Sequence, residues 1–151
     1  MRKGLLVLVI LLAGCGAQAA APSKVTATNE QFRSEASPAQ FAAGRTVDVT
    51  LVVTGPMLYE GGCAQTFGIW AVDSQDRQVW TEPVPQIACF ARVKGSIGNG
   101  KTVSFHASWP TSSALAPGKY TIHGLFLTAL ERGAIARVRE NMPPLTVAVT
   151  S

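Results

Sequence analysis

Few residues of this chain have the types and spacing that chemistry requires, and one segment has the pattern of a phosphate-binding loop. Residues 95–102 read GSIGNGKT and fit G-x-x-x-x-G-K-[ST] at every position. Such a loop binds phosphate where it begins a helix, because amide groups at the helix N-terminus hold the anion. Residues 102–109 instead alternate polar and apolar side chains and stop at Pro110, which predicts a strand. We therefore expect a turn between strands and no nucleotide site.

The only two histidines, His106 and His123, could serve as metal ligands or as general bases. A metal site needs further ligands at short spacing, and neither histidine has one. The chain also lacks a G-x-S-x-G segment, the turn that presents the nucleophilic serine of many hydrolases. The sequence therefore predicts a protein that is not an enzyme and that holds no metal and no cofactor.

The start of the chain has the order of a bacterial export signal. Basic residues at positions 2 and 3 precede an apolar run over residues 4–13, which is about 15 Å of helix and too short to span a bilayer. The run ends in LAGC at residues 12–15, which resembles the lipobox of bacterial lipoproteins. That resemblance implies that residues 1–14 are a signal peptide and that the Cys15 thiol carries diacylglycerol. Acyl chains contribute about 0.8 kcal/mol per buried CH₂, so two or three would hold the protein on a membrane.

Ordinary secretion remains the alternative to lipidation. Residues 17–19 read AQA and also fit an A-x-A cleavage site, in which case Cys15 belongs to a discarded peptide. Both interpretations predict an exported protein. With the lipid anchor, we expect it on the cell membrane or outer membrane, facing the periplasm or the exterior.

Net charge gives no sign of a nucleic-acid partner. Cleavage before Cys15 would remove Arg2 and Lys3 and lower the formal net charge from +4 to +2. The remaining basic residues are scattered singly along the chain, whereas a nucleic-acid interface needs them clustered. We therefore expect partners of another kind, namely the membrane through the lipid anchor and a protein of the cell envelope.

Two cysteines remain once Cys15 is assigned to the anchor. Cys63 and Cys89 form an even pair in an oxidising compartment, where a disulfide is the usual outcome. A metal site is disfavoured because no C-x-x-C motif or nearby histidine accompanies them. Closing a loop of roughly 27 residues would stabilise the fold by about 3.5 kcal/mol in the chain-entropy model.

Apolar and polar residues alternate with a period of two along several segments, which predicts the strands that must position the candidate residues. Val47, Val49, Leu51 and Val53 share one face of a predicted strand, and no stretch of twelve residues has a clear helical period. Turn residues separate seven or eight short segments of this kind, which predicts an all-β antiparallel sandwich. The predicted strands occupy residues 25–28, 46–53, 66–72, 77–81, 87–93, 102–109, 120–128 and 145–149.

Tyr120 adds a topological signal to the strand pattern. It begins a predicted strand just after Pro117-Gly118, as in a tyrosine corner, where the hydroxyl bonds to the backbone a few residues upstream and fixes a Greek-key crossing. The alternative is a tyrosine that only packs at the start of a strand.

A family resemblance follows from this series of segments. The series consists of Asp73, Val79-Trp80, the loop at residues 98–100, the strand at 103–109 and the L-x-P-G-x-Y motif that ends at Tyr120. It is similar to the domain of the intracellular proteinase inhibitor BsuPI. The resemblance covers roughly residues 44–127 and implies an immunoglobulin-like, Greek-key sandwich, a fold also found in exported bacterial proteins. The turn at 74–76 lacks the glycine usual in the family, and the tryptophan-rich segment is reduced to WTE at 80–82. The resemblance therefore implies the fold more than the inhibition.

These observations divide the chain into three parts. Residues 1–14 are the predicted signal peptide, residues 15–37 a lipid-anchored tether that contains a first strand, and residues 38–151 a single immunoglobulin-like β-sandwich domain. We expect a membrane-anchored, non-catalytic binding module of the bacterial envelope. The alternative is a proteinase inhibitor that acts through an exposed loop, as the resemblance implies.

A contact surface is expected at one end of the sandwich. Residues 57–62 read MLYEGG, an apolar composition that is unusual for a plain connection, and residues 83–86 form a second loop nearby. Exposed apolar loop residues mark interaction sites. Among the tryptophans, we assign Trp70 and Trp109 to the core and Trp80 to a partly exposed position. The candidate contact residues are therefore Met57, Leu58, Tyr59 and Trp80.

Overall fold

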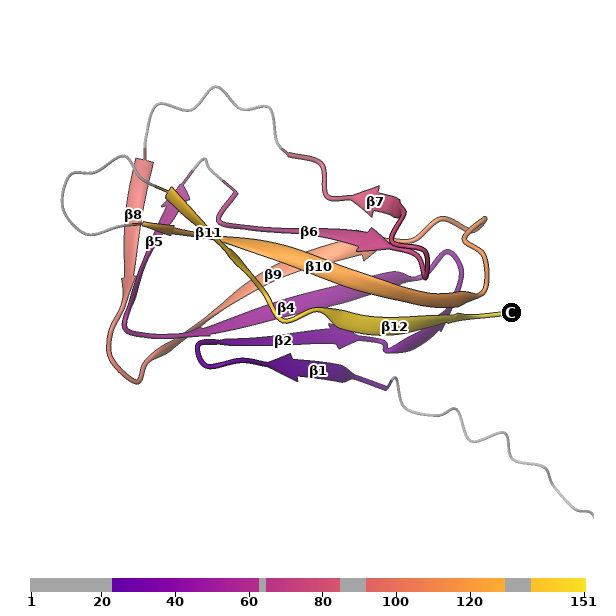
Figure 1. Cartoon of the computed structure of the whole chain (residues 1–151), viewed down its shortest axis with the longest axis horizontal. Helices are drawn as coiled ribbons and strands as arrows, with labels where there is room; N and C mark the ends of the chain where they lie inside the picture. Colours follow the sequence, from indigo (N-terminus) through magenta and orange to yellow (C-terminus); the bar gives the residue numbers. More distant parts are fainter. Residues whose placement is uncertain (1–22, 63–64, 85–91, 130–136) are drawn as a thin grey trace, which may run out of the picture.

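The computed structural model describes residues 23–62, 65–84, 92–129 and 137–151, and these parts of the chain contain strands and turns but no helix. Two sheets form a sandwich (Figure 1). The twelve strands are β1 (Val25–Thr28), β2 (Phe32–Ser37), β3 (Gln40–Ala42), β4 (Thr46–Thr54), β5 (Met57–Gly62), β6 (Phe67–Val72), β7 (Gln78–Thr81), β8 (Arg92–Ile97), β9 (Thr102–Pro110), β10 (Gly118–Ala129), β11 (Arg137–Asn141) and β12 (Leu145–Thr150).

The first sheet contains β1, β2, β4 and β9 in that order, and each neighbouring pair is antiparallel. The central strand β4 shows why it forms, because Val47, Val49, Leu51 and Val53 are fully buried while the residues between them face outward. β9 pairs with all nine residues of β4. The predicted alternation at residues 46–53 and 102–109 is therefore confirmed.

The second sheet is organised around β10, its longest strand. β12 and β11 pair with successive parts of one edge of β10, and β6 pairs with the other edge. β7 lies beyond β6, and β3 lies beyond β12 in a parallel pairing. β5 and β8 form an antiparallel ribbon at one end of the sheet, where β5 joins β10 through Tyr59 opposite Thr128 (Figure 1).

The connections between sheets give the sandwich its topology. The chain passes from β4 in the first sheet to β6 in the second, returns to β9, and crosses again to β10. In the lettering of immunoglobulin-like domains, β4 and β9 correspond to strands B and E of one sheet, and β6, β10 and β12 correspond to strands C, F and G of the other. The order of these strands along the chain and in the two sheets is the Greek-key order of an immunoglobulin-like sandwich. The predicted all-β sandwich is confirmed, with twelve strands in place of the expected seven or eight.

The boundary predicted at residue 38 is wrong. Residues 25–28 and 32–37 are β1 and β2 of the first sheet, so the folded part includes most of the segment expected to be a tether. Phe32, Ser34 and Ala36 are buried, and this inward row escapes a search for alternating hydrophobicity because its middle member is polar. The additional strands β2, β3, β5 and β11 account for the larger strand count.

Aromatic side chains from both sheets meet in the core. Phe126 on β10 is fully buried, and its ring centroid lies 5.8 Å from that of Phe32, 6.0 Å from Tyr59 and 4.9 Å from Phe105. Phe32 and Phe105 come from the first sheet, and Tyr59 comes from β5. Aromatic contacts of this kind stabilise a fold beyond the area they bury. They hold the two sheets at a fixed distance.

The predicted tyrosine corner is confirmed. Tyr120 near the start of β10 is 6% exposed, and its hydroxyl donates a hydrogen bond of 2.7 Å to the carbonyl of Ala116. The ring packs 5.9 Å from the ring of Trp109, centroid to centroid. The bond joins the turn before β10 to the strand itself, at the point where the chain enters the second sheet.

Tyr120→Phe should therefore lower the free energy of unfolding by about 1–3 kcal/mol while the fold is retained, because the Ala116 carbonyl loses its phenolic donor. Chemical denaturation of the wild type and the variant measures this difference. Wild-type stability in the variant would contradict the structural role assigned to the hydroxyl.

Ser34 offers the opposite expectation. Its side chain is fully buried on β2, and its hydroxyl has no hydrogen-bond partner among the described residues. Burying an unpaired hydroxyl costs about 1–3 kcal/mol, so Ser34→Ala should raise the free energy of unfolding by about 1 kcal/mol. The exposed Ser104 on β9 supplies the control, since Ser104→Ala should change stability by less than about 0.5 kcal/mol. A less stable Ser34→Ala variant would contradict the prediction.

Candidate functional site

The contact surface predicted at residues 57–62 is not an exposed loop. This segment is strand β5, and its side chains at Met57, Leu58 and Tyr59 are partly buried. The ring of Tyr59 lies over Gly95 on β8, where a Cβ atom would overlap it, and packs 5.3 Å from the ring of Phe105. The expectation of an exposed loop is wrong because a glycine on the partner strand makes room for the tyrosine.

The structure agrees with the predicted burial of Trp80 and Trp109 and disagrees with that of Trp70. Trp109 is 2% exposed in the core and Trp80 is half-buried with its ring 6.3 Å from that of Trp109, both as expected. Trp70 is not a core residue. The inward positions of β6 are taken by Ile69 and Ala71, so Trp70 lies on the outer face of the second sheet. There its ring stacks on His123 of β10, with 5.3 Å between centroids and 15° between planes.

The two histidines lie on different sheets. His106 is on the outer face of β9, where its Nδ1 lies 3.1 Å from the hydroxyl oxygen of Thr50, and His123 stacks on Trp70. Among the described residues, no three His, Cys, Asp or Glu side chains come close enough together to hold a metal ion. The structure therefore gives each histidine a role in packing or hydrogen bonding.

The segment with the phosphate-loop pattern is a turn between strands, as predicted. Residues 95–97 belong to β8, residues 98–101 make the turn, and β9 begins at Thr102. The Gly55 amide donates a hydrogen bond of 2.9 Å to the Lys101 carbonyl, and a Cβ atom on Gly55 would overlap the backbone of Ile97. Gly55 therefore allows the turn between β4 and β5 to pack closely against the turn between β8 and β9.

Several predicted residues lie outside the described part of the chain. Cys15, Cys63 and Cys89 belong to residues 1–22, 63–64 and 85–91, so lipidation and the disulfide stay predictions. Elsewhere, the described residues contain no helix with the length and hydropathy that a membrane crossing requires.

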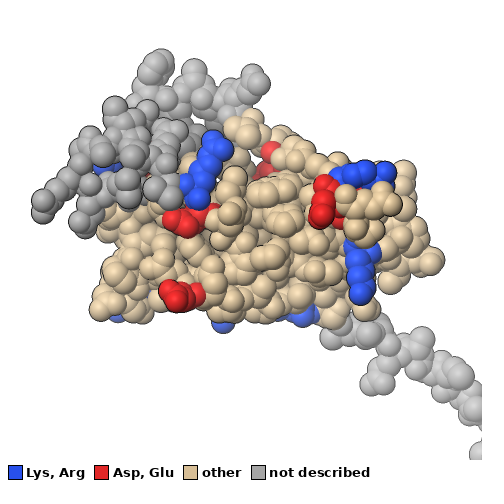
Figure 2. Space-filling view, in the orientation of Figure 1, with Lys and Arg blue, Asp and Glu red and all other residues tan. Residues whose placement is uncertain are grey.

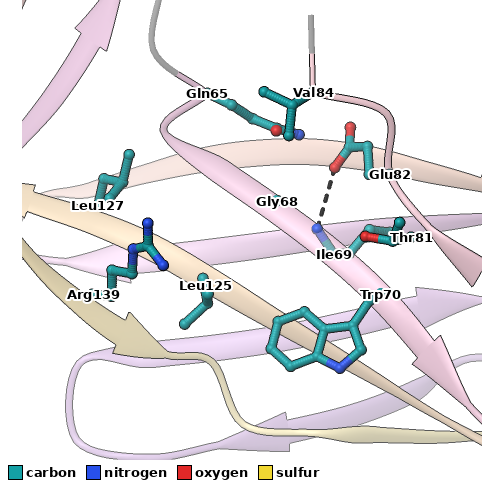
Figure 3. Close-up of a pocket in the computed structure, with 10 residues that line it drawn as sticks. All are labelled: Gln65, Gly68, Ile69, Trp70, Thr81, Glu82, Val84, Leu125, Leu127 and Arg139. Atoms are coloured by element: carbon teal, nitrogen blue, oxygen red, sulfur yellow. Dashed lines mark hydrogen bonds between the residues drawn. The ribbon is translucent and has the colours of Figure 1, made fainter. Parts of the chain in front are cut away.

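A hollow of about 390 Å³ opens on the outer face of the second sheet, beside Trp70 (Figure 3). It spans β6, β10 and β11 and extends to the segment that follows β7. Figure 2 shows that charged side chains are few and scattered on the visible face of the molecule. The lining residues are Gln65, Gly68, Ile69, Trp70, Thr81, Glu82, Val84, Leu125, Leu127 and Arg139.

The floor of this cavity is apolar because of the cross-strand register. Gly68 on β6 lies opposite Leu125 on β10, and the glycine leaves open the space that a side chain would fill. Leu125 and Leu127 occupy the outward positions that follow His123 along β10. The three heavy atoms nearest to a Cβ atom on Gly68 would all belong to the flexible side chain of Gln65, at 3.3–3.4 Å. A larger residue at this position could therefore fill the cavity without entering the core.

Glu82 lies on one side of the cavity, where the chain leaves β7. Its backbone amide donates to the Ile69 carbonyl at 3.0 Å, and its carboxylate accepts a hydrogen bond of 3.2 Å from the Ile69 amide. Burial raises the pKa of the Glu82 carboxyl, while hydrogen bonds from the Ile69 amide and the Gln65 side chain oppose the rise. Glu82 thus places an acceptor at the edge of β6.

Arg139 lies on the opposite side of the floor. It is an exposed residue of β11, opposite Leu127 of β10, and it makes no ion pair with any of the described residues. Figure 3 shows Arg139 and Glu82 on either side of Gly68 and Leu125, with the guanidinium group directed over the floor. The cavity therefore combines an apolar centre with one acidic and one basic side.

The sequence interpretation missed this site. The signal was the row His123, Leu125 and Leu127, which is largely apolar although it faces away from Tyr120 and Ile122 of the core. An apolar row on the outer face of an exposed sheet indicates a contact surface. Thr81 and Glu82 follow directly after Trp80, which was among the predicted contact residues.

Comparison with known proteins assigns the chain to no family. No protein-family model matches the sequence, and a search of curated proteins gives no match either.

Proposed function

We propose that the protein is a non-catalytic binding module of the bacterial cell envelope, and that its partner contacts the cavity beside Trp70. The observation that carries this proposal is the apolar floor at Gly68 and Leu125 with Glu82 and Arg139 on its two sides. Ligand sites combine an apolar surface, which supplies affinity, with a few polar groups that fix orientation. The cavity has both components.

The membrane anchor is the second part of the proposal. The motif ending at Cys15 supports a lipidated N-terminus, and nine residues lie between this cysteine and the first residue of β1, Val25. Such a connection reaches at most about 35 Å when extended. The domain would thus bind its partner close to the membrane surface, facing the periplasm or the exterior.

Site-specific photo-crosslinking in cells tests the binding function. A photoreactive amino acid at Val84, a 71% exposed residue on the rim of the cavity, should crosslink to a partner protein of the envelope. The same group at Ser104, exposed on β9 of the other sheet, should not give that product.

Filling the cavity provides the matched control. Gly68→Leu should abolish the Val84 crosslink, whereas Ser104→Leu, the same kind of change on the other sheet, should leave it intact. Equal products from Val84 and Ser104, or no product from either, would rule out an envelope partner at this surface.

One observation favours the alternative of a proteinase inhibitor. Val84 is the most exposed large apolar residue of the described chain and stands next to Pro83, in the connection that follows β7. An inhibitory loop must be exposed and rigid, and proline restricts the backbone. Incubation of the full-length protein with a panel of proteinases should then show stoichiometric inhibition that Val84→Asp removes. Absence of inhibition across the panel would leave the binding module as the sole candidate.

A further inference from the structure

We propose that the cavity binds an extended segment of the partner in which a basic, an apolar and an acidic residue occupy every second position. This inference rests on the proposed function and specifies the chemistry of the partner. Side chains at alternate positions of an extended chain point to the same side, so these three residues would face the sheet together.

The apolar residue is assigned to the floor. Gly68 leaves a depression between Trp70 and Leu125, and the neighbouring Leu127 continues the apolar surface. Placing an aliphatic side chain there would remove apolar surface of both partners from water.

The two charged residues follow from the sides of the cavity. Glu82 offers a carboxylate that accepts hydrogen bonds from the Ile69 amide and the Gln65 side chain, and an ammonium or guanidinium group of the partner would complement its negative charge. Arg139 has no acidic partner among the described residues, and a carboxylate would pair with it. An uncharged acyl chain would pair with neither group, and a ligand of a single charge would pair with only one of them.

The spacing of the two charges sets the spacing of the motif. Glu82 lies beside β6, β6 pairs with β10, and β10 pairs with β11, which carries Arg139. The two residues are therefore three strand spacings apart, about 14 Å across the sheet. Ile69, the neighbour of Glu82, lies opposite Gly124 of β10, whereas Arg139 lies opposite Leu127. Arg139 is therefore displaced from Glu82 by three residues along the strands, about 10 Å. The two backbone positions are therefore about 17 Å apart.

An extended segment of five residues matches this distance. Its first and fifth Cα atoms lie about 14 Å apart, and the flexible side chains of the basic residue and of Arg139 span the remainder. Residues three apart in an extended chain would point to opposite sides, and a dipeptide would be too short. The pattern basic-x-apolar-x-acidic is the shortest one that places three side chains on the same side and lets both charged groups reach their counterparts.

Titration of the full-length protein with short peptides, blocked at both ends, tests the pattern. The peptide KSLSE should bind saturably in isothermal titration calorimetry. SKLES has the same composition with the charges adjacent to the leucine, and KSLSK places a lysine at Arg139, so both should bind at least tenfold more weakly. Gly68→Leu should weaken the binding of KSLSE by at least tenfold.

A charge exchange distinguishes specific recognition from a general effect of the substitutions. Arg139→Glu should reverse the preference, so that KSLSK binds at least tenfold more tightly than KSLSE. Arg45→Glu, at an exposed arginine before β4, should leave the wild-type preference unchanged. Equal affinity for KSLSE and SKLES, an unchanged preference in Arg139→Glu, or no binding of any peptide would overturn the inference.

The outcome is separable from that of the proposed function. A Val84 crosslink that Gly68→Leu abolishes, together with no preference among the peptides, would retain the binding module and reject this ligand chemistry. Peptide recognition with no crosslink in cells would retain the ligand chemistry and reject the envelope partner.

Discussion

Cys15→Ser should move the protein from the membrane fraction to the soluble fraction, or block its maturation, and should abolish its labelling with palmitate. The wild-type chain combines a basic start, a ten-residue apolar run and LAGC at residues 12–15. Serine has no thiol to accept diacylglycerol, so the variant would lose its anchor. Two or three acyl chains give stable membrane attachment, whereas the apolar run by itself is too short to span a bilayer.

The cleavage site separates this expectation from ordinary secretion. A lipoprotein is cut before Cys15, and its N-terminal residue carries the lipid, whereas cleavage after the AQA segment at 17–19 would leave an unmodified amine. The intact mass of the mature wild-type protein distinguishes the two. Cys89→Ser, which removes another cysteine of the same chain, should leave fractionation and labelling unchanged. Unchanged fractionation and labelling of Cys15→Ser would show that the anchor does not exist.

The regular part of the fold could be predicted from the sequence because inward and outward residues differ in hydrophobicity. On β4 the buried members are all Val or Leu, so the period of two was visible. On β2 the buried row includes Ser34, and on β5 the sequence ends in glycines, so neither strand had a recognisable pattern. Strands β2 and β5 are determined by tertiary contacts with their partner strands, and a single sequence does not show which segments will pair.

The candidate site was less accessible to sequence interpretation, for a geometric reason. The sequence predicts Trp70 in the core, as for a tryptophan that packs against an inter-sheet disulfide, but its side chain alternates with Ile69 and Ala71 and so faces outward. The cavity beside it depends on Gly68 lying opposite Leu125. That register joins segments more than fifty residues apart, and neither segment predicts it alone.

Replacing both Cys63 and Cys89 by alanine should lower the free energy of unfolding by about 3.5 kcal/mol, through loss of a bridge that closes a loop of roughly 27 residues. The prediction rests on the sequence, in which Cys63 and Cys89 are the two cysteines left in an exported chain once Cys15 is assigned to the anchor. Both lie outside the residues that the structure describes.

Two measurements test the bridge and its energetic role separately. Alkylation of the denatured full-length protein without reductant, followed by intact mass analysis, should leave Cys63 and Cys89 unmodified, and reductant should expose both. Denaturation of the wild type with reductant should then reproduce the lower stability of the double variant, because both chains lack the cross-link. Two alkylated cysteines without reductant would refute the bridge. Equal stability of the oxidised wild type and the variant would show that the bridge does not stabilise the fold.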